Sequence, residues 1–378
     1  MEVSLFSFFA GVGMMDLAFE RSNYNIVLVN ENEKQFINAY RYAREQLHIG
    51  SPIYGYYEKS AEYFSKRRGK KRLQLYMARE RTLDHIVGFI GGPPCPDFSV
   101  AGKNKGSQGE NGRLTKTYFD IVCRNQPDFF VFENVKGLVR TEKHRVFYEE
   151  MRKKLMENGY SLSHKILNSL SYGVPQSRER IILIGIKGSV FPTIQAITEN
   201  GEFTFPWDES MSEDIEIILA QNWPTTQKFV KNSRRKNKMP NYERLTVEYW
   251  FRMNDVYHHA NTYDRFKVQS GAEKITVIDE GDTSGKSFKR LHRWRFSPTA
   301  CYGHNEVHLH PYKTRRLSVA EAMAIQSLPR DFTLPHKMPL SLKFKCIGNG
   351  VPFLLAQGVA RSLFSYLCRL DKEREKDD

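Results

Sequence analysis

The fold is best indicated by one stretch, Ile86-Val87-Gly88-Phe89-Ile90-Gly91-Gly92-Pro93-Pro94-Cys95. Its apolar first half, bounded by glycines, is typical of a strand that is buried on both faces of a parallel sheet. The two prolines then restrict the backbone, so Cys95 is presented at a defined place where the strand ends. Residues 96–113 are rich in Gly, Ser, Asn and Lys and are predicted to form a mobile lid. Cys95 is either an inert buried thiol or a nucleophile, and this stretch leaves both open.

The composition indicates a globular protein with a polyanionic partner. The chain has 378 residues, of which 40% are hydrophobic, so it can bury a core in one large or two ordinary domains. Its 57 Lys and Arg exceed its 43 Asp and Glu, giving a net charge of +14. This excess favours nucleic acid as partner, although a basic protein without such a partner has the same balance.

The cysteines and the first residues indicate a cytoplasmic protein. The five cysteines are odd in number and lack the close spacing of a zinc or redox motif, which favours a reducing compartment. The apolar residues 3–9 follow Glu2 rather than a basic segment, so they are predicted to be a strand and not a signal peptide. No apolar run approaches the roughly 20 residues that span a membrane, and no membrane association is expected.

The first 32 residues are typical of a nucleotide-binding unit. A strand at 3–9, a turn containing Gly11 and Gly13, and a helical pattern at 14–20 allow the backbone to approach a ligand closely. A second apolar strand, 25–29, ends in Asn30-Glu31-Asn32. Glu31 thus lies about 20 residues after the turn, where an acid can accept hydrogen bonds from ribose hydroxyls. An ordinary loop with solvated acids is the alternative.

Two further strand ends carry polar groups. The apolar run 128–132 ends in Glu133-Asn134, at the same predicted sheet edge as Cys95, where ligands of open α/β sheets collect. Arg178 and Arg180 occupy alternate positions before the strand 181–186, so they are predicted to point the same way, toward a shared anionic or carbonyl target. A surface pair of salt bridges is the alternative.

The chain divides into three segments by pattern. Residues 1–186 alternate apolar strands with helices, residues 187–300 are polar with scattered aromatics, and residues 301–378 return to the first pattern. Within the middle segment, the basic run containing Arg234, Arg235 and Lys236 suits contacts with nucleic acid, and a small β-rich core is the alternative. Ser318 and Glu321 predict a capping box. Residues 345–352 are predicted to open a last helix that reaches about Leu370, ahead of a frayed charged tail.

Seven short motifs occur in a fixed order and cover nearly the whole chain outside residues 187–290. They are Phe9-Ala10-Gly11-Val12-Gly13, Asn30-Glu31, Pro93-Pro94-Cys95 with Phe98-Ser99, Glu133-Asn134-Val135, Gln176-Ser177-Arg178-Glu179-Arg180, Arg316-Leu317-Ser318 with Gln326, and Gly348-Asn349-Gly350-Val351. Taken together they resemble the DNA (cytosine-5) methyltransferase family of the bacterial restriction-modification type. Each motif alone is weak, whereas the ordered set is highly specific.

The resemblance implies a fold and a cofactor. The fold class expected is α/β, with a Rossmann-like catalytic domain around a mixed, mostly parallel sheet and a smaller irregular target-recognition domain at 187–300. The cofactor expected is S-adenosyl-L-methionine. Its predicted contacts are Phe9, Ala10, Gly11, Val12, Gly13, Met14, Asn30, Glu31, Asn32, Pro93, Asn349 and Val351.

The resemblance also assigns the chemistry. The predicted catalytic residues are Cys95, Glu133, Asn134, Arg178 and Arg180, and the predicted DNA contacts are Ser99, Gln176, Arg234, Arg235 and Lys236. Cys95 would add to carbon 6 of a flipped-out cytosine while Glu133 supplies a proton near ring nitrogen 3. No metal site is predicted, because the histidines near His308 and His310 lack a ligand-like spacing.

The expected partner is double-stranded DNA carrying a specific target sequence. A cognate restriction endonuclease, a monomeric state and a location beside the nucleoid of a prokaryote follow from the resemblance. A tRNA cytosine methyltransferase and a catalytically silent DNA-binding regulator on the same fold are the alternatives. The long region 187–290 favours DNA, and retention of Cys95 and Glu133 argues against a silent regulator.

Four positions depart from the family pattern. Pro96 follows the cysteine where most members carry Gln, Met14 replaces a frequent Gly, and Gly350 stands where Ala or Ser is usual. The acid expected to bind the adenine amine, near residues 58–60, has no clear counterpart.

Overall fold

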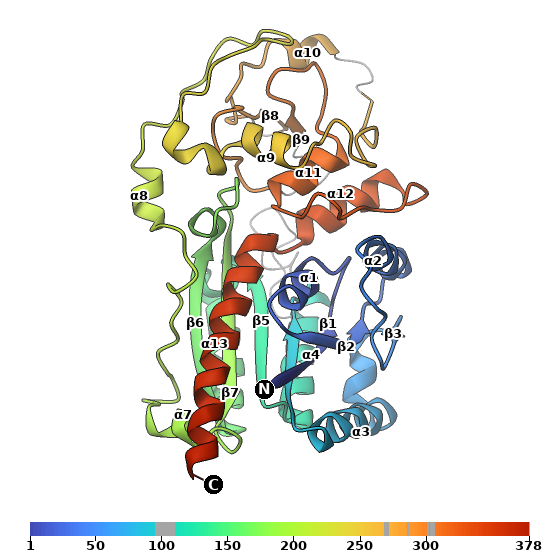
Figure 1. Cartoon of the computed structure of the whole chain (residues 1–378), viewed down its shortest axis with the longest axis vertical. Helices are drawn as coiled ribbons and strands as arrows, with labels where there is room; N and C mark the ends of the chain where they lie inside the picture. Colours follow the sequence, from blue (N-terminus) through green and yellow to red (C-terminus); the bar gives the residue numbers. More distant parts are fainter. Residues whose placement is uncertain (95–109, 268–271, 286, 301, 303–306, 378) are drawn as a thin grey trace.

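The computed structural model describes residues 1–94, 110–267, 272–285, 287–300, 302 and 307–377. Two lobes are stacked along the long axis of the molecule (Figure 1). The large lobe surrounds a seven-stranded sheet, and the small lobe, residues 215–317, consists of short helices and a two-stranded sheet. The predicted lid, 96–113, lies outside the described residues except for its last four, which belong to the helix α4 (Glu110–Asn125).

The large sheet is mixed and mostly parallel, as predicted. The strand order is β3-β2-β1-β4-β5-β7-β6, and β7 runs opposite to the other six strands, so both of its pairings are antiparallel. The strands are β1 (Glu2–Phe8), β2 (Asn25–Asn30), β3 (Tyr56–Tyr57), β4 (His85–Gly91), β5 (Phe129–Val135), β6 (Tyr160–Asn168) and β7 (Glu179–Lys187). The predicted strands at 3–9, 25–29, 86–90, 128–132 and 181–186 are therefore confirmed within one to three residues.

Helices cover both faces of this sheet, which explains why its central strands are apolar throughout. One face packs against α1 (Met14–Glu20), α2 (Lys34–Gln46) and α13 (Phe353–Asp377). The other face packs against α3 (Arg67–Thr82), α4 (Glu110–Asn125) and α6 (Glu142–Glu157). Figure 1 shows α13 in front of the sheet and α4 behind it. The remaining short helices are η1 (Ala61–Ser65), α5 (Gly137–Arg140), η3 (Ser169–Tyr172) and α7 (Pro192–Ala196).

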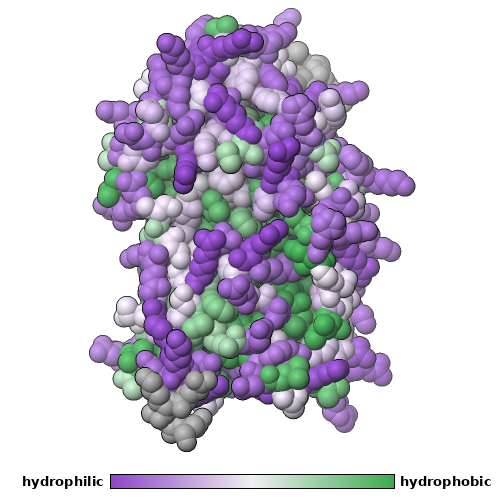
Figure 2. Space-filling view, in the orientation of Figure 1, coloured by the Kyte–Doolittle hydropathy of each residue, from purple (hydrophilic) through white to green (hydrophobic). Residues whose placement is uncertain are grey.

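The small lobe contains little regular structure. Its elements are α8 (Ile215–Leu219), η4 (Pro240–Leu245), α9 (Val247–Met253), α10 (Ala272–Thr276), β8 (Phe288–Arg290) and β9 (Val307–Leu309). Most of its visible face in Figure 2 is hydrophilic. The lobe is joined to the large lobe through α11 (Val319–Ile325) and α12 (Leu340–Asn349), because opposite faces of α11 contribute to the cores of both lobes.

A buried ionic network fixes α11 to the small lobe. The predicted capping box is confirmed, since Ser318 Oγ accepts the Glu321 amide and the Glu321 carboxylate accepts the Ser318 amide. Arg315 binds the same carboxylate through two nitrogens, at 2.8 and 2.6 Å. His310 lies 3.5 Å from it and also contacts the Tyr257 hydroxyl. His310 is therefore part of this buried network.

Two expectations about the end of the chain were wrong. The predicted last helix is two helices, because α12 ends at Asn349 and α13 begins at Phe353, after Pro352. The charged tail is helical as far as Asp377.

The two lobes share residues around the predicted boundaries at 186 and 300. Phe203, Phe205 and Trp207 pack in the core of the large lobe, and β9 pairs with β8 in the small lobe.

Residues 340–374 include the one described helical stretch that is long and apolar enough to cross a membrane. Its most apolar window is 72% buried inside the protein, and α13 packs along α1. Its apolar side chains therefore belong to the core.

Gly88 tests how tightly the centre of the sheet is packed. A Cβ at this position would lie 2.2 Å from Phe129 Cζ and 2.7 Å from Leu5 Cδ2. We expect Gly88→Ala to lower the free energy of unfolding by about 1–3 kcal/mol, since overpacking forces these side chains apart. Urea unfolding measures this loss. Gly50→Ala is the control, because no atom lies within 4 Å of its added carbon, and equal stability of the two variants would contradict the expectation.

Candidate active site at the carboxyl edge of the sheet

The predicted site residues lie at one edge of the large sheet. β1, β2, β4 and β5 are parallel, so their carboxyl ends meet at this edge. The turn after β1, the acid after β2, the prolines after β4 and Glu133 at the end of β5 all lie there. This is the edge at which open α/β sheets bind ligands.

The turn after β1 has a conformation that depends on its glycines. Gly11 and Gly13 have φ of 58° and 79°, in the left-handed region, and Phe9 shares this region with φ of 55°. Apart from the two adjacent residues, no atom of the described residues lies within 4 Å of the position where a Cβ of Gly11 would be, so the backbone is open on this side. At Gly13 a Cβ would lie 2.4 Å from the Tyr40 ring, so this glycine allows α2 to approach closely.

Glu31 supports this turn from the end of β2. One carboxylate oxygen accepts the Gly11 amide at 2.9 Å, and the other accepts the Glu33 amide at 2.8 Å. Burial raises the pKa of Glu31, and these backbone hydrogen bonds oppose that rise. A carboxylate has about four acceptor positions, so Glu31 can still accept a hydrogen bond from a ligand hydroxyl. Asn30 holds the next segment, since its side-chain amide donates to Tyr57 O and Lys59 O; Asn32 is exposed.

A buried polar cluster beneath the turn was missed by the sequence reasoning. The Arg44 guanidinium donates to Gly13 O at 3.1 Å and forms an ion pair with Glu20 at 2.8 Å. Asp16 accepts hydrogen bonds from Tyr40 and Ser7, both at 2.9 Å. The sequence did contain a signal for this cluster. Asp16 in α1 and Arg44 in α2 lie on the buried faces of their helices, and a buried charge requires a partner of opposite charge.

Glu133 forms the acidic centre of the site. Its carboxylate is buried and lies 3.0 Å from Arg180 Nε. Burial raises the pKa of Glu133, while the charges of Arg180 and Arg178 oppose the rise. A Cβ at Gly92 would lie 2.8 Å from Glu133 Oε2, so the glycine brings the backbone after β4 against the carboxylate. The protonation of Glu133 therefore depends on the balance between burial and the two arginine charges.

Asn134 connects this acid to the segment that precedes Cys95. Its side-chain nitrogen donates to Pro93 O at 3.3 Å, and its oxygen accepts the Val135 amide at 2.9 Å. These contacts agree with the predicted role of holding the backbone. Pro93 is buried and Pro94 is exposed. Cys95, Pro96 and Ser99 lie outside the described residues.

Arg178 holds the carboxyl-terminal segment near the site. Its buried guanidinium donates to three backbone carbonyls, those of Ala300 at 3.0 Å, Gly348 at 2.7 Å and Gly350 at 3.1 Å. Its charge also acts on Glu133, the ion-pair partner of Arg180. Arg178 therefore connects the start of β7 to the segment that carries the predicted cofactor residues Asn349, which is exposed, and Val351, which is buried.

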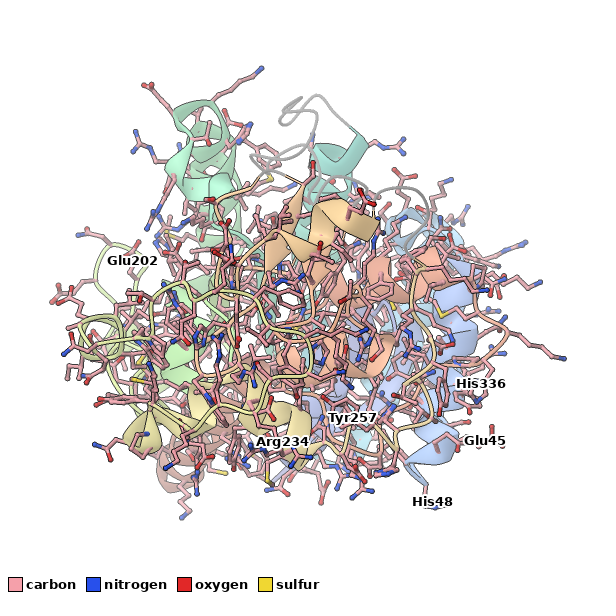
Figure 3. The ribbon with its side chains drawn as sticks, turned by 90° about the horizontal axis from the view of Figure 1, so that it is seen from above. Glu45, His48, Glu202, Arg234, Tyr257 and His336 are labelled. Atoms are coloured by element: carbon pink, nitrogen blue, oxygen red, sulfur yellow. The ribbon has the colours of Figure 1, made fainter. Side chains whose placement is uncertain are left out.

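Two residues predicted to contact DNA have partners within the protein. Gln176 is fully buried, and its amide binds the Gln326 side chain at 3.0 Å and the Ala300 amide at 2.8 Å. It is therefore not on the surface that DNA can reach. Arg235 forms an ion pair with the buried Glu280 at 3.3 Å and a hydrogen bond with Gln227. Its neighbours Arg234 and Lys236 are exposed, and Figure 3 labels Arg234 on the small lobe.

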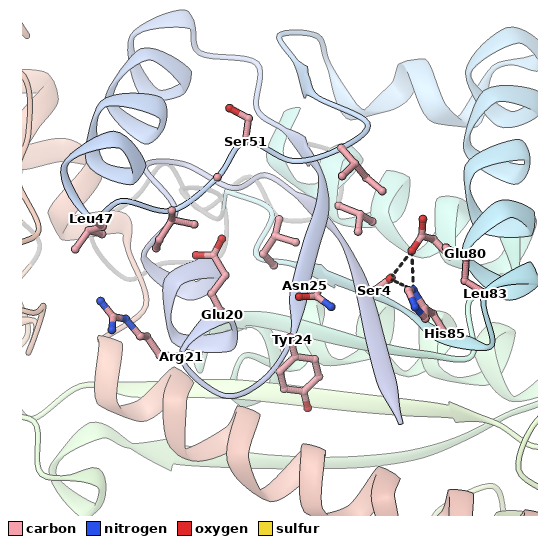
Figure 4. Close-up of a pocket in the computed structure, with 15 residues that line it drawn as sticks. Ser4, Glu20, Arg21, Tyr24, Asn25, Leu47, Ser51, Glu80, Leu83 and His85 are labelled. Carbon is pink, nitrogen blue, oxygen red and sulfur yellow. Dashed lines mark hydrogen bonds and ion pairs between the residues drawn. The ribbon is translucent and has the colours of Figure 1, made fainter.

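A pocket of about 610 Å³ lies at the opposite ends of the strands, lined by Ser4, Asn25 and His85 among others (Figure 4). Ser4, Glu80 and His85 form hydrogen bonds there. Both Ser4 Oγ and Glu80 Oε2 approach the same ring nitrogen, Nδ1. A serine nucleophile needs its acid on the other ring nitrogen, so these three residues do not form a catalytic triad.

Comparison with known proteins identifies the family. The profile of the C-5 cytosine-specific DNA methylase family matches residues 3–365. The chain belongs to this family. It is 49% identical to the Type II methyltransferase M.NmeDI of Neisseria meningitidis serogroup C, over 99% of the chain and 86% of the relative. It is 28% identical to the Type II methyltransferase M.MthTI of Methanothermobacter thermautotrophicus, over 96% and 97%.

Solved structures agree with the fold of the methylase. A candidate DNA modification methyltransferase encoded within an E. coli prophage has a TM-score of 0.63 at 19% identity, covering 97% of this chain and 99% of that one. The S. pombe Dnmt2 methyltransferase has a TM-score of 0.57 at 12% identity, covering 97% and 99%. The family profile and the relative at 49% identity confirm the predicted DNA (cytosine-5) methyltransferase activity of the restriction-modification type. The solved structures confirm the α/β fold class.

The cluster beneath the turn predicts a pH dependence of stability. Burial raises the pKa of Glu20 from 4.5 to about 7, so between these values the folded methylase holds a proton that the unfolded chain releases. The stabilisation by this proton is complete below pH 4.5 and is lost as the pH rises through about 7. We expect wild type to lose on the order of 2 kcal/mol relative to Glu20→Gln between pH 5 and 8.

Urea unfolding at both pH values measures this difference. Glu45→Gln is the control, because Glu45 lies exposed on α2 (Figure 3). If the stability difference between wild type and Glu20→Gln is the same at both pH values, Glu20 does not hold the proton.

Proposed function

We propose that this methylase transfers a methyl group from S-adenosyl-L-methionine to carbon 5 of a flipped-out cytosine in double-stranded DNA, through a covalent bond to Cys95. The observation that carries the proposal is the arrangement around Glu133. The buried carboxylate is paired with Arg180, and the adjacent Asn134 holds Pro93, two residues before Cys95. Glu133, Arg180 and the segment that leads to Cys95 therefore meet at the carboxyl ends of β4 and β5.

The chemistry explains why these groups are needed together. Carbon 5 of cytosine is too weak a nucleophile, so the Cys95 thiolate forms a bond to carbon 6 and converts the ring into an enamine. Glu133 donates a proton at ring nitrogen 3 as negative charge develops there, which a raised pKa favours. With S-adenosylmethionine bound, carbon 5 would take its methyl group and leave S-adenosylhomocysteine. A base would then remove the proton on carbon 5, the nitrogen 3 proton would return to Glu133, and the sulfur–carbon 6 bond would break to release Cys95. Arg180 orients the Glu133 carboxylate throughout.

The residues around the β1 turn fit the cofactor. The backbone at Gly11 is open, and the Glu31 carboxylate beside it retains acceptor capacity for ribose hydroxyls. Phe9–Met14, Asn30–Asn32 and Pro93 would line the same side, with Asn349 and Val351 approaching from the carboxyl-terminal segment. When bound, S-adenosylmethionine supplies an activated methyl group. Arg178 acts by holding the Gly348 and Gly350 carbonyls rather than by touching the base.

DNA would bind between the lobes, with the target cytosine swung out of the stack because carbon 6 is otherwise hidden. Ser99 and the residues of the predicted lid would close over the base, and the exposed Arg234 and Lys236 would contact phosphates. The small lobe would select the target sequence. Since its relatives are named as Type II methyltransferases, we propose that the methylase acts as a monomer in a prokaryotic cytoplasm, beside the nucleoid, with a cognate restriction endonuclease.

The covalent step can be tested with DNA that contains 5-fluorocytosine at the target. Fluorine at carbon 5 blocks the final elimination, so we expect wild type to form an adduct that survives denaturing electrophoresis. Cys95→Ser should form none and should lose activity by at least about 10³-fold, as enzymes do that lose a covalent nucleophile. A label on the methyl group of S-adenosylmethionine measures methyl transfer to the DNA.

Cys123→Ser is the matched control, because burial raises the pKa of this thiol on α4 to about 11 and makes it unreactive. It should trap DNA like wild type. Retained activity of Cys95→Ser without an adduct would exclude the mechanism, and methylation of tRNA instead of duplex DNA would favour the alternative substrate. Failure to methylate any nucleic acid would favour a silent regulator.

Glu31 allows the cofactor site to be tested separately from the DNA site. We expect Glu31→Ala to weaken S-adenosylmethionine binding about tenfold or more, since the turn loses a charged hydrogen-bond acceptor and the ribose loses its partner. DNA affinity should stay within about twofold. Calorimetry measures the S-adenosylmethionine affinity and fluorescence anisotropy measures the DNA affinity, with Glu33→Ala as the control. Equal loss of both affinities would contradict two separate sites.

A further inference from the structure

Met14 and Gly350, two of the positions that depart from the family pattern, lie in direct contact. They are 336 residues apart in sequence, one at the start of α1 and the other between α12 and α13. A Cβ at Gly350 would lie 2.2 Å from Met14 Sδ and 2.7 Å from Met14 Cε. Non-bonded atoms are in contact at about 3.5–4.0 Å, so any side chain at 350 requires a shift of about 1 Å or more.

The backbone at Gly350 does not itself require glycine. Its φ of −65° and ψ of 154° are adopted by every L-residue. The third neighbour of the added carbon, Cys346 O, is at 3.3 Å and needs only a small adjustment. The conflict at this position is therefore with the Met14 side chain alone.

Met14 has little free space, because it is 3% exposed and packs in the main core. Gly350 is partly buried, and the buried Arg178 donates to the carbonyls of Gly348 and Gly350. A side chain at 350 would push the end of the Met14 side chain into the core. This conflict can be relieved by moving the start of α1, which follows the cofactor turn, or the segment that carries Asn349.

We propose that Met14 and Gly350 are a matched positioning pair that sets the separation between the turn Phe9–Gly13 and the segment Gly348–Val351. This inference rests on the proposed function, in which both segments contact S-adenosylmethionine. The large side chain at 14 occupies the volume that a Cβ at 350 would need, so the two positions determine the width of the cofactor site jointly. A displacement of about 1 Å between groups that grip one ligand is large enough to weaken its binding strongly.

The experiment measures S-adenosylmethionine affinity by calorimetry. Gly350→Ala should bind about tenfold to a hundredfold more weakly, the range expected when overpacking is relieved by moving one binding segment. The double variant Met14→Ala, Gly350→Ala should bind at least about threefold more tightly than Gly350→Ala, because the smaller side chain removes the conflict. The KM for S-adenosylmethionine should rise in Gly350→Ala, with kcat at saturation changed less.

Gly358→Ala is the matched control. Its Cβ would lie 2.4 Å from the Tyr172 ring, so it introduces a comparable steric conflict on α13. It should lower the melting temperature, as Gly350→Ala does, while leaving cofactor affinity unchanged. The inference is overturned if Gly350→Ala binds like wild type, if the double variant does not recover, or if Gly358→Ala loses as much affinity. Failure of wild type to bind S-adenosylmethionine would overturn the proposed cofactor site as well.

Discussion

The antiparallel pairing of β7 with β5 is the constraint on which the site depends. In this register Val135 lies opposite Arg180, so the first residues of β7 meet the last residues of β5. A parallel β7 would carry Arg180 to the far end of the sheet, roughly 25–30 Å away for a strand of this length. The Glu133–Arg180 ion pair, and the reach of Arg178 to three carbonyls beyond the sheet, exist because this strand is reversed.

The ion pair combines two opposed effects on Glu133. Burial favours the protonated acid, and the nearby arginines favour the carboxylate. A group balanced in this way can give up and regain a proton when a base enters or leaves the site. The glycine at 92 and the Asn134–Pro93 contact place the end of β4 against the same carboxylate, so acid and nucleophile-bearing segment are positioned by adjacent strands.

Much of the fold could be predicted because central strands are apolar throughout and end at recognisable turns. β1, β4 and β5, and the acid after β2, were identified in this way. The partners of polar residues could not be predicted. Gln176 and Arg235, both predicted to contact DNA, bind Gln326 and Glu280, which lie 150 and 45 residues further along. Whether a polar side chain faces solvent or a distant partner is not encoded in its own segment.

The sequence by itself determined the strands, the glycine turn and the reactive groups at strand ends, since periodicity and backbone preference are local properties. Only the tertiary structure decided which of these groups meet. It separated Arg178 from Arg180, placed Tyr40 and Arg44 beneath the turn, and brought Met14 against Gly350. Close packing is the physical reason, because an added carbon at one position excludes an atom hundreds of residues away.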